Sequence, residues 1–216
     1  MQRLVLSAIL LGLSLAVSAC STSGPVMRNA PAELGAAAML QMPSEEALTP
    51  VQPSMPDWTV ARVEVNVPET LTVSEANTLR PRADIVWRED PLGNRYQQVA
   101  DLMMEPLQDV LPMMQGSRSV VVRLDVETFH AQTQRVRYTF GGAHDIIFDL
   151  TVLDAQTGAP IMGPVTRDLT FRALGGQEAV DSEARGIGQR ERIQARLRDW
   201  TREEFGLPIQ YSGLVF

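Results

Sequence analysis

The chain has 216 residues, of which 44% are hydrophobic and 21% are charged, a composition typical of a soluble globular domain. Its net charge of −7 and its pI near 4.9 argue against a nucleic-acid partner, because such proteins usually carry a basic surface. Cys20 is the only cysteine, so we expect no internal disulfide, no thiol redox pair and no cysteine-rich zinc site.

The N-terminal segment predicts a lipoprotein signal peptide over residues 1–19. An apolar run over 4–17 follows one arginine and is shorter than the ~18–20 residues needed to cross a bilayer. The run leads into Val-Ser-Ala-Cys, which resembles the bacterial lipobox. The resemblance implies cleavage before Cys20 and attachment of diacylglycerol and a fatty acid such as palmitate, which would anchor the protein to a membrane. A plain signal peptide that leaves a free thiol is the alternative.

Residue 21 is serine rather than aspartate. By resemblance to sorted lipoproteins, this implies the outer membrane, with the mature domain facing the periplasm.

Residues 20–56 are predicted to carry the lipid and to form a flexible tether. The segment is rich in Ser, Thr and Ala and contains six prolines (Pro25, Pro31, Pro43, Pro50, Pro53 and Pro56). A flexible coil of about 36 residues spans roughly 30–36 Å. An alternative is that part of it packs on the domain, with Met39, Leu40 and Met42 as anchors.

Residues 57–216 are predicted to form a single α+β domain. Its first half starts with an alternating strand that places Ala61, Val63, Val65 and Val67 on one face, followed by a short strand over 83–87. A helical pattern then runs to residue 114. Asp90 before Pro91 suits its start, and Pro106 is expected to kink or split it.

The second half predicts three strands and a final helix. The strands are expected over 119–131, within 136–154, and over 160–173. The helical region covers 177–205, with a firm part from residue 189, and Gly206 and Pro208 end it. Strands joined by short turns should pair antiparallel. The predicted fold is therefore an antiparallel sheet in ββαβββα order, with two helices packed on one face.

Both histidines lie in the stretch FHAQTQRVRYTFGGAHDII, residues 129–147. Strand alternation places His130 and His144 on the apolar face. If 131–143 is all loop, the two histidines oppose each other and a two-ligand metal site is conceivable. If the turn lies near 132–135 and Gly-Gly is a bulge, they stand roughly 25 Å apart at about 3.3 Å per residue.

The second register is favoured, because a loop of about 13 residues would be long and would waste the alternation of RVRYTF. A metal site would also need a third ligand, and Asp145 points to the other face. We therefore expect no metal ligand and no catalytic residue among the histidines.

The polar face of these strands offers further candidates for chemistry. Three carboxylates, Asp125, Glu127 and Asp149, could act as acid and base or hold Ca²⁺. Three arginines on the same face could neutralise them (Arg123, Arg135 and Arg137). A solvated sheet face is the favoured interpretation. The chain has no Gly-rich phosphate loop, no G-x-S-x-G and no H-E-x-x-H motif, and no cofactor is predicted.

Two segments near the C-terminus also allow two interpretations each. The arginine-rich stretch 185–204 could contact anionic lipid headgroups, but a solvated helix face is favoured. The apolar tail 207–216 could be a final edge strand or a segment that pairs with a partner.

The stretches DIVWREDPLGNRYQQV (84–99) and VVVRLDVETFHAQTQRVRYTFGGAHDIIFDLTVLDAQTG (120–158) resemble an uncharacterised family of small proteobacterial lipoproteins, a domain of unknown function. The resemblance covers roughly residues 58–205 and implies no catalytic residue, cofactor or partner. The architecture of lipobox, tether and small α+β domain is more loosely similar to envelope lipoproteins that assist ABC-type transporters.

Three functional hypotheses remain. The first is a non-catalytic periplasmic lipoprotein, an interaction or accessory module in envelope assembly or transport with an unknown envelope protein as partner. The second is a carrier of an apolar ligand or lipid between helices and sheet, where methionines such as Met103, Met104, Met113 and Met114 could line a pocket. The third, least favoured, is an enzyme.

Overall fold

The computed structural model describes residues 55–210 and 213–214. The predicted signal peptide, Cys20 and almost all of the 20–56 tether lie outside the described residues, and so do residues 39–42, the proposed anchors on the domain. Within the described part of the chain, no helix combines the length and the apolar character needed to span a membrane.

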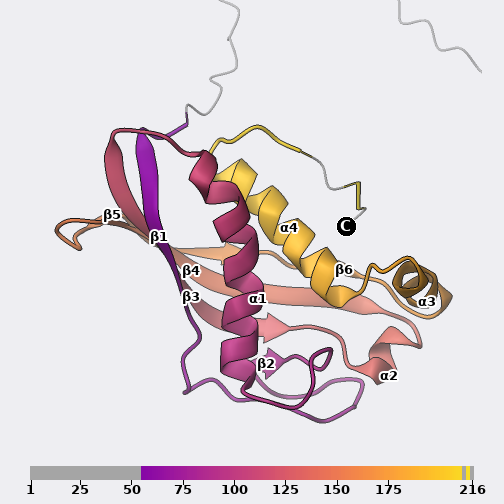
Figure 1. The fold of residues 1–216 in the computed structure, drawn as a ribbon. Helices are drawn as coiled ribbons and strands as arrows, with labels where there is room; N and C mark the ends of the chain where they lie inside the picture. The colour runs from indigo at the N-terminus through magenta and orange to yellow at the C-terminus, as the bar shows by residue number, and fades with distance from the viewer. Residues whose placement is uncertain (1–54, 211–212, 215–216) are drawn as a thin grey trace, which may run out of the picture. The chain divides into compact units, whose positions relative to one another are not determined.

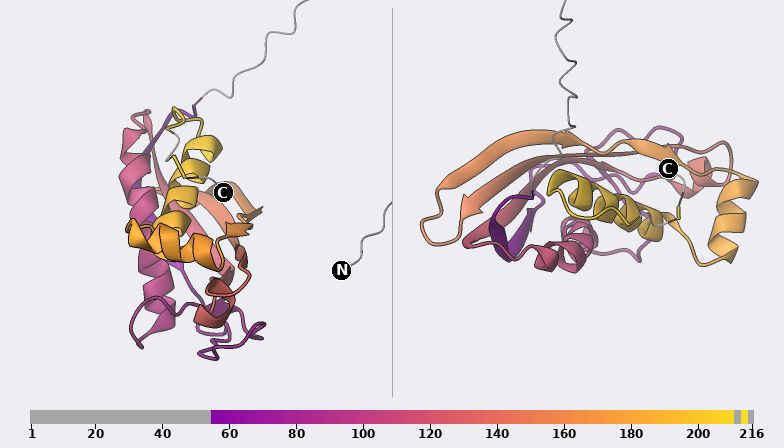
Figure 2. Two further views of the ribbon diagram at one scale, coloured as in Figure 1. Left: turned by 90° about the vertical axis from the view of Figure 1, so that its right-hand side faces the viewer. Right: turned by 90° about the horizontal axis from the view of Figure 1, so that it is seen from above.

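One sheet and two long helices form the body of the domain (Figure 1). The strands are β1 (Trp58–Asn66), β2 (Ile85–Val86), β3 (Arg118–His130), β4 (Gly142–Asp154), β5 (Pro160–Asp168) and β6 (Phe171–Ala173). The helices are α1 (Arg95–Val110), α2 (Gln134–Arg137), α3 (Gln177–Ala184) and α4 (Gln189–Glu204), with a short 3₁₀ turn η1 (Leu111–Met113). Helices α1 and α4 lie on the same face of the sheet (Figure 2). The predicted α+β class and the two helices on one face are confirmed.

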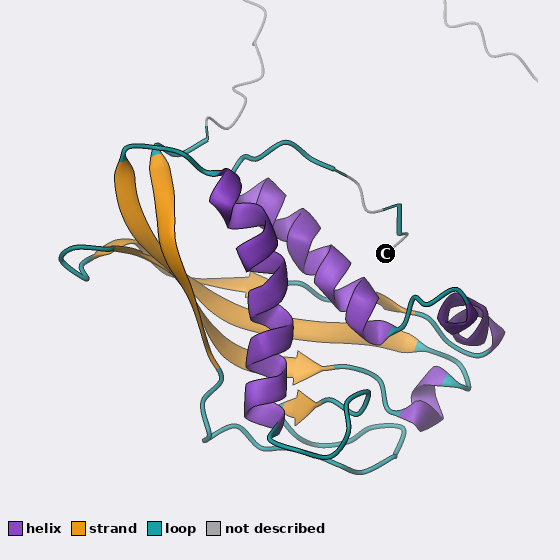
Figure 3. Cartoon of the chain, viewed as in Figure 1, coloured by secondary structure: helices purple, strands orange, loops and turns teal. Residues whose placement is uncertain are grey.

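The sheet is mixed rather than wholly antiparallel. Its order is β1-β3-β4-β5, with β2 paired to the far end of β3 and β6 to the start of β4. The pairs β3–β4, β4–β5 and β4–β6 are antiparallel as predicted, but β1 and β2 run parallel to β3. The reason is α1, which crosses the sheet between β1 and β3 and returns the chain in the same direction (Figure 3).

Helix α1 begins later than Asp90 and continues past its proline. Asn94 caps the helix, its side chain accepting a hydrogen bond from the Gln97 backbone N–H at 3.2 Å. Pro106 lies inside the helix, which ends only at Val110. Pro106 therefore does not split the helix. The helix ends before Pro112, which lies in the 3₁₀ turn.

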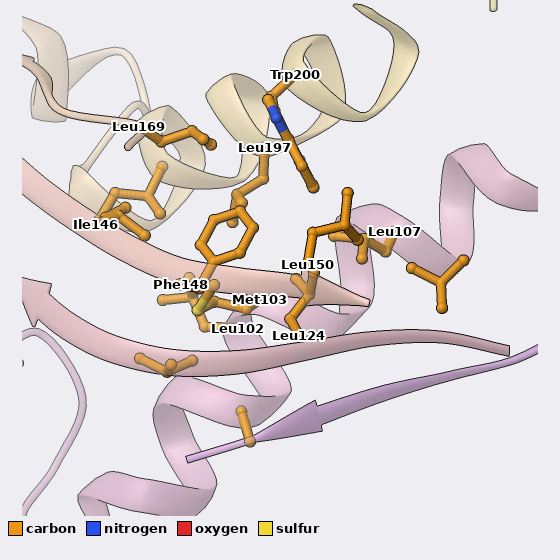
Figure 4. Close-up of a cluster of buried hydrophobic side chains, with 14 of the residues drawn as sticks. Leu102, Met103, Leu107, Leu124, Ile146, Phe148, Leu150, Leu169, Leu197 and Trp200 are labelled. Carbon is orange, nitrogen blue, oxygen red and sulfur yellow. The ribbon is translucent and has the colours of Figure 1, made fainter. Parts of the chain in front are cut away.

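The core fills the space between the sheet and the two long helices. Buried side chains of β3 and β4 face those of α1 and α4, and Figure 4 shows this packing around Phe148. The rings of Phe148 and Trp200 meet edge to face, with centroids 5.0 Å apart. Met103 and Met114 are buried in this cluster, whereas Met113 is 42% exposed. These three methionines are therefore core or surface residues.

Two bulges alter the predicted alternation. In β3, Val126 pairs with Phe148 and Thr128 pairs with Ile147, so Glu127 is an extra residue. Beyond it the parity is reversed, and Phe129 takes the core side while His130 turns to the opposite face. In β1 the register shift falls between Val60 and Arg62, so Ala61 is exposed instead of facing the core with Val63 and Val65.

The favoured register of the histidine hairpin is wrong. Strand β4 begins at Gly142, not at Val136, and the connection contains α2. His130 pairs with Asp145 across the strands, one residue from the opposition to His144 that the alternative register predicted. The prediction failed because residues that alternate like a strand form the short helix α2 instead, and Thr133 caps its start.

The Gly-Gly pair ends this connection and is not a bulge. Gly141 has a φ of 77°, a conformation that favours glycine. A Cβ on Gly175 would lie 2.0 Å from the Gly141 backbone nitrogen, so the two backbones touch. This contact fixes the loop before α3 against the start of β4.

Candidate functional site

Four segments meet at the N-terminus of α4, and the first two are distant in sequence from each other and from the last two. They are the loop after β2, helix α2, helix α3 and the first turn of α4. Together they line a hollow of about 390 Å³ (Arg88, Glu89, Gln134, Arg137, Tyr138, Glu183, Gly186, Gly188, Gln189 and Glu191). We call this the α4 pocket.

Arg137 is the centre of the α4 pocket. Its side chain is only 10% exposed and forms ion pairs with Glu89, at 3.1 Å, and with Glu183. Tyr138 donates a hydrogen bond from its hydroxyl to Glu183 at 3.1 Å. Partial burial, together with the hydrogen bond to the Glu183 carboxylate, raises the pKa of Tyr138 above its ordinary value. The phenol therefore remains protonated at neutral pH.

The positive end of α4 is neutralised by carboxylates of the chain itself. The Gly188 backbone N–H donates to Glu191 at 2.8 Å, and the Gln189 N–H donates to Glu89 at 3.1 Å. A Cβ on Gly188 would lie 2.5 Å from Glu89 Oε1, so the carboxylate sits directly against the helix start. An external anion would have to displace Glu89 from both Arg137 and α4.

His144 lies near the N-terminal end of β4, behind the α4 pocket, and its side chain is buried. It is 1% exposed, and its ring centroid is 4.9 Å from that of Phe171. Its Nδ1 and the side-chain nitrogen of Gln132 have no hydrogen-bond partner among the described residues. Burial, reinforced by the charges of Arg192 and Arg137, lowers the pKa of His144 to about 3. The imidazole is therefore neutral at physiological pH.

The interior beside His144 leaves little room for a ligand. A cavity of about 10 Å³ beside His144 has room for little more than a single water. Among residues 55–210 and 213–214, no group of three or more His, Cys, Asp and Glu side chains is arranged to hold a metal ion. The ion pairs and hydrogen bonds join α2, α3 and α4 to the end of the sheet.

The two predicted histidines are not brought together. His144 faces the helices, whereas His130 is half-buried on the opposite face, where its Nε2 is hydrogen-bonded to the carbonyl of Ala83. The placement of His144 on the apolar face is confirmed, and that of His130 is wrong because of the Glu127 bulge.

The predicted acidic cluster is only partly assembled. Asp125 and Asp149 oppose each other on β3 and β4, and each has a polar neighbour: Asn66 donates to Asp125 and Thr166 donates to Asp149. Glu127 is exposed in the bulge. Of the three arginines, only Arg123 is paired on this face, with Glu64, while Arg137 points into the α4 pocket and Arg135 is exposed on α2.

The outer edge of β1 is the second notable feature. From Val60 to Asn66, β1 pairs with β3 on one side and with no described strand on the other. A hollow of about 340 Å³ lies beside this edge, lined by Val60, Ala61, Arg62, Val63, Gln108, Leu111 and Pro112. The opposite edge strand, β5, carries Pro160 and Pro164, which lack a backbone N–H, and its register shifts twice against β4.

Comparison with known proteins gives a family but no activity. The model of a family of unknown function (DUF6778) matches residues 58–214, including the stretches 84–99 and 120–158, and confirms the resemblance to an uncharacterised family. No curated protein matches the chain.

Three solved structures are similar at a distance. A candidate lipoprotein from Caulobacter crescentus CB15 is 20% identical over 50% of this chain and 80% of its own, with a TM-score of 0.34. A Xanthomonas campestris protein of the family DUF330 is 12% identical over 71% of this chain and 86% of its own, with a TM-score of 0.42. An uncharacterised protein is 18% identical over 69% of this chain and 90% of its own, with a TM-score of 0.28.

Proposed function

We propose that this chain, which belongs to the family of unknown function DUF6778, is a lipid-anchored, non-catalytic interaction module of the bacterial envelope. The Val-Ser-Ala-Cys sequence that ends at Cys20 supports the lipid anchor, and Ser21 supports the outer membrane and its periplasmic face. An acyl chain contributes about 0.8 kcal/mol per buried CH₂, so several chains on one cysteine would hold the protein stably at the membrane.

The open edge of β1 carries the interaction part of this proposal. An edge strand presents backbone N–H and C=O groups that an extended segment of a partner can pair with, and the adjacent hollow can accept alternate side chains. The proline-bearing edge at β5 is protected against such pairing, whereas no proline interrupts β1. The partner expected here is an envelope protein that contributes an extended, partly apolar segment.

The two other hypotheses have less support. A carrier needs an apolar interior cavity, but the buried side chains between sheet and helices form one continuous cluster, and the large hollows among the described residues lie at its surface. An enzyme needs accessible acid–base or nucleophilic groups, whereas the carboxylates around Arg137 are held in ion pairs and His144 is enclosed and neutral.

Two experiments test the two parts separately. For the anchor, we expect intact-mass spectrometry of the purified mature protein to show acyl groups on Cys20, and Cys20→Ala to release the protein from the membrane fraction. A mature N-terminus without fatty acid would refute the anchor.

For the interaction, a photo-crosslinking amino acid is placed at Ala61 on the open edge and, as a control, at Gln156 in the exposed turn after β4. Irradiation of intact cells should give a discrete adduct from position 61 and none from position 156. Equal labelling at the two positions, or no adduct at position 61, would contradict a role for the β1 edge.

A further inference from the structure

We propose that a second surface, at the far end of β3 from Arg118, binds directly to a lipid bilayer that contains anionic headgroups. This surface comprises Leu79, Arg80, Arg82, Arg135 and Phe140, and we call it the arginine–phenylalanine patch. The proposal rests on the proposed function only in placing the domain near a membrane, since the contact itself needs no lipid on Cys20.

The patch joins two segments that are distant in sequence. The loop before β2 and helix α2 lie side by side in Figure 3, held by two hydrogen bonds. Thr133 donates from its hydroxyl to the Thr78 carbonyl at 2.9 Å, and the Arg135 backbone N–H donates to the Asn77 side chain at 2.8 Å. Between the segments lies a hollow of about 270 Å³, whose apolar lining includes Leu79, Pro81, Val136 and Phe140.

Two large apolar side chains of the patch are exposed. Phe140 is 71% exposed and Leu79 is 43% exposed, and both line the same hollow. Phe140 stands in the connection between α2 and β4, just before Gly141. An aromatic ring in such a turn can enter the headgroup region of a bilayer without any rearrangement of the sheet.

The arginines of the patch differ from most others in the described chain. Eleven arginines form ion pairs with carboxylates (Arg62, Arg88, Arg95, Arg118, Arg123, Arg137, Arg167, Arg172, Arg190, Arg196 and Arg198). Arg80, Arg82 and Arg135 are exposed and form no ion pair with a described residue. Arg80 lines the hollow itself, while Arg82 follows Pro81 and Arg135 precedes Val136, both of which line it. The patch therefore offers three arginines without an ion-pair partner among the described residues, close to exposed apolar side chains.

Charge complementarity favours a membrane as the occupant. The whole chain has a net charge of −7, so an anionic surface repels most of the molecule and can be approached only through a locally positive face. Asp145 is the one acidic residue among those that line the hollow; it is half-buried and pairs across the strands with His130. Arginine beside an exposed aromatic residue is the combination found in interfacial binding.

The test uses the whole mature chain with Cys20→Ser, so that no lipid anchor contributes. Its partition is measured by co-sedimentation with vesicles of phosphatidylcholine alone and of phosphatidylcholine with about 30% phosphatidylglycerol at about 0.1 M salt. We expect binding to the anionic vesicles only. Replacing Arg80, Arg82 and Arg135 together by Gln should weaken it about a hundredfold, from about fivefold for each arginine.

Matched controls lie at the other end of β3. Met113→Ser removes an apolar side chain that is 42% exposed, nearly the same as Leu79, and Arg118→Gln removes an exposed arginine that is ion-paired with Asp154. We expect Phe140→Ser and Leu79→Ser to weaken vesicle binding and both controls to leave it unchanged. Circular dichroism would establish that all variants are folded.

Three outcomes would overturn the proposal: no binding to anionic vesicles, equal binding to neutral vesicles, or equal losses in the patch and control variants. A protein partner for the patch would appear as the first of these, together with a photo-crosslinked adduct from position 140 in cells. None of these outcomes bears on acylation of Cys20, which is tested by mass and fractionation. The two proposals can therefore fail independently.

Discussion

Acidification from pH 7 to pH 5 should destabilise the domain chiefly through His144. The pKa of this imidazole is about 3 in the folded protein because the ring is buried beside Arg192 and Arg137, whereas an unperturbed histidine has a pKa of 6.5. Because the pKa is lower in the folded protein than in the unfolded chain, the contribution of His144 to the free energy of unfolding is at its maximum above pH 6.5. It is lost progressively as the pH falls toward 3, because only the unfolded chain binds the proton.

The size of the effect follows from these two values. A pH of 5 is about 1.5 units below the pKa of the unfolded imidazole, which is therefore protonated. The folded ring is still neutral at this pH. At 1.36 kcal/mol per unit, the free energy of unfolding should fall by about 2 kcal/mol. A loss of that size is large, because domains are stable by only about 5–15 kcal/mol.

The assay is urea denaturation at pH 7 and pH 5 of the wild type and of His144→Gln. We expect the wild type to lose about 2 kcal/mol more than the variant between these pH values. Carboxylates with lowered pKa values, such as Glu75 and Asp90, titrate in both proteins and largely cancel in the comparison. His130→Gln, which removes the only other histidine, serves as the matched histidine-to-glutamine control.

Two results would refute the reasoning: equal losses in wild type and His144→Gln, or an imidazole that titrates near neutral pH. The second can be measured even if His144→Gln does not fold. In His130→Gln, His144 is the only histidine, so its ring protons can be followed by NMR as the pH is lowered. We expect their chemical shifts to remain constant from pH 7 to pH 5.

Three further substitutions test the fold and the α4 pocket, each by urea denaturation. Gly175→Ala should cost about 1–3 kcal/mol, since its Cβ would lie 2.0 Å from the Gly141 nitrogen, and an unchanged midpoint would contradict that contact. Phe148→Ala should cost about 3–5 kcal/mol, because it empties the core space against Trp200, and a loss below about 1 kcal/mol would mean that the core is not packed as described. Arg137→Gln should cost about 1–3 kcal/mol by removing the ion-pair partner of Glu89 and Glu183, and should accelerate amide exchange in α3. Unchanged exchange would argue that the ion pairs do not hold that helix.

The elements of regular pattern could be predicted from the sequence. Alternation located β3 and β4, and helical spacing located α1 and α4, so the class and the layers followed. Parallel pairing of β1 did not follow, because short-range pattern gives the direction of a strand only relative to a neighbour joined by a short turn. The bulges at Ala61 and Glu127 were not predicted either. One extra residue leaves the apolar–polar alternation of the sequence intact but exchanges the faces of the side chains beyond it.

The α4 pocket could not have been predicted in this way. Glu89, Arg137 and Glu183 lie far apart in the sequence, and none of them forms a motif with its neighbours in sequence. The one available signal was Gly188 three residues before Glu191, a spacing that permits a helix start with a returning carboxylate. The position of His144 on the core face was predictable because β4 has no bulge between it and Phe148.

The parallel connection of β1 sets an order of assembly. In the β1–β3 pair, Trp58 pairs with Arg118, roughly 60 residues later in the sequence. In the β3–β4 hairpin, His130 pairs with Asp145, only about 15 residues later. Closing the longer loop costs about 1.2 kcal/mol more in chain entropy, because each doubling adds about 0.6 kcal/mol. The hairpin of β3 and β4 should therefore nucleate folding, and β1 should dock late, although it is synthesised first. Substitutions in β1 should consequently speed unfolding while leaving the refolding rate almost unchanged.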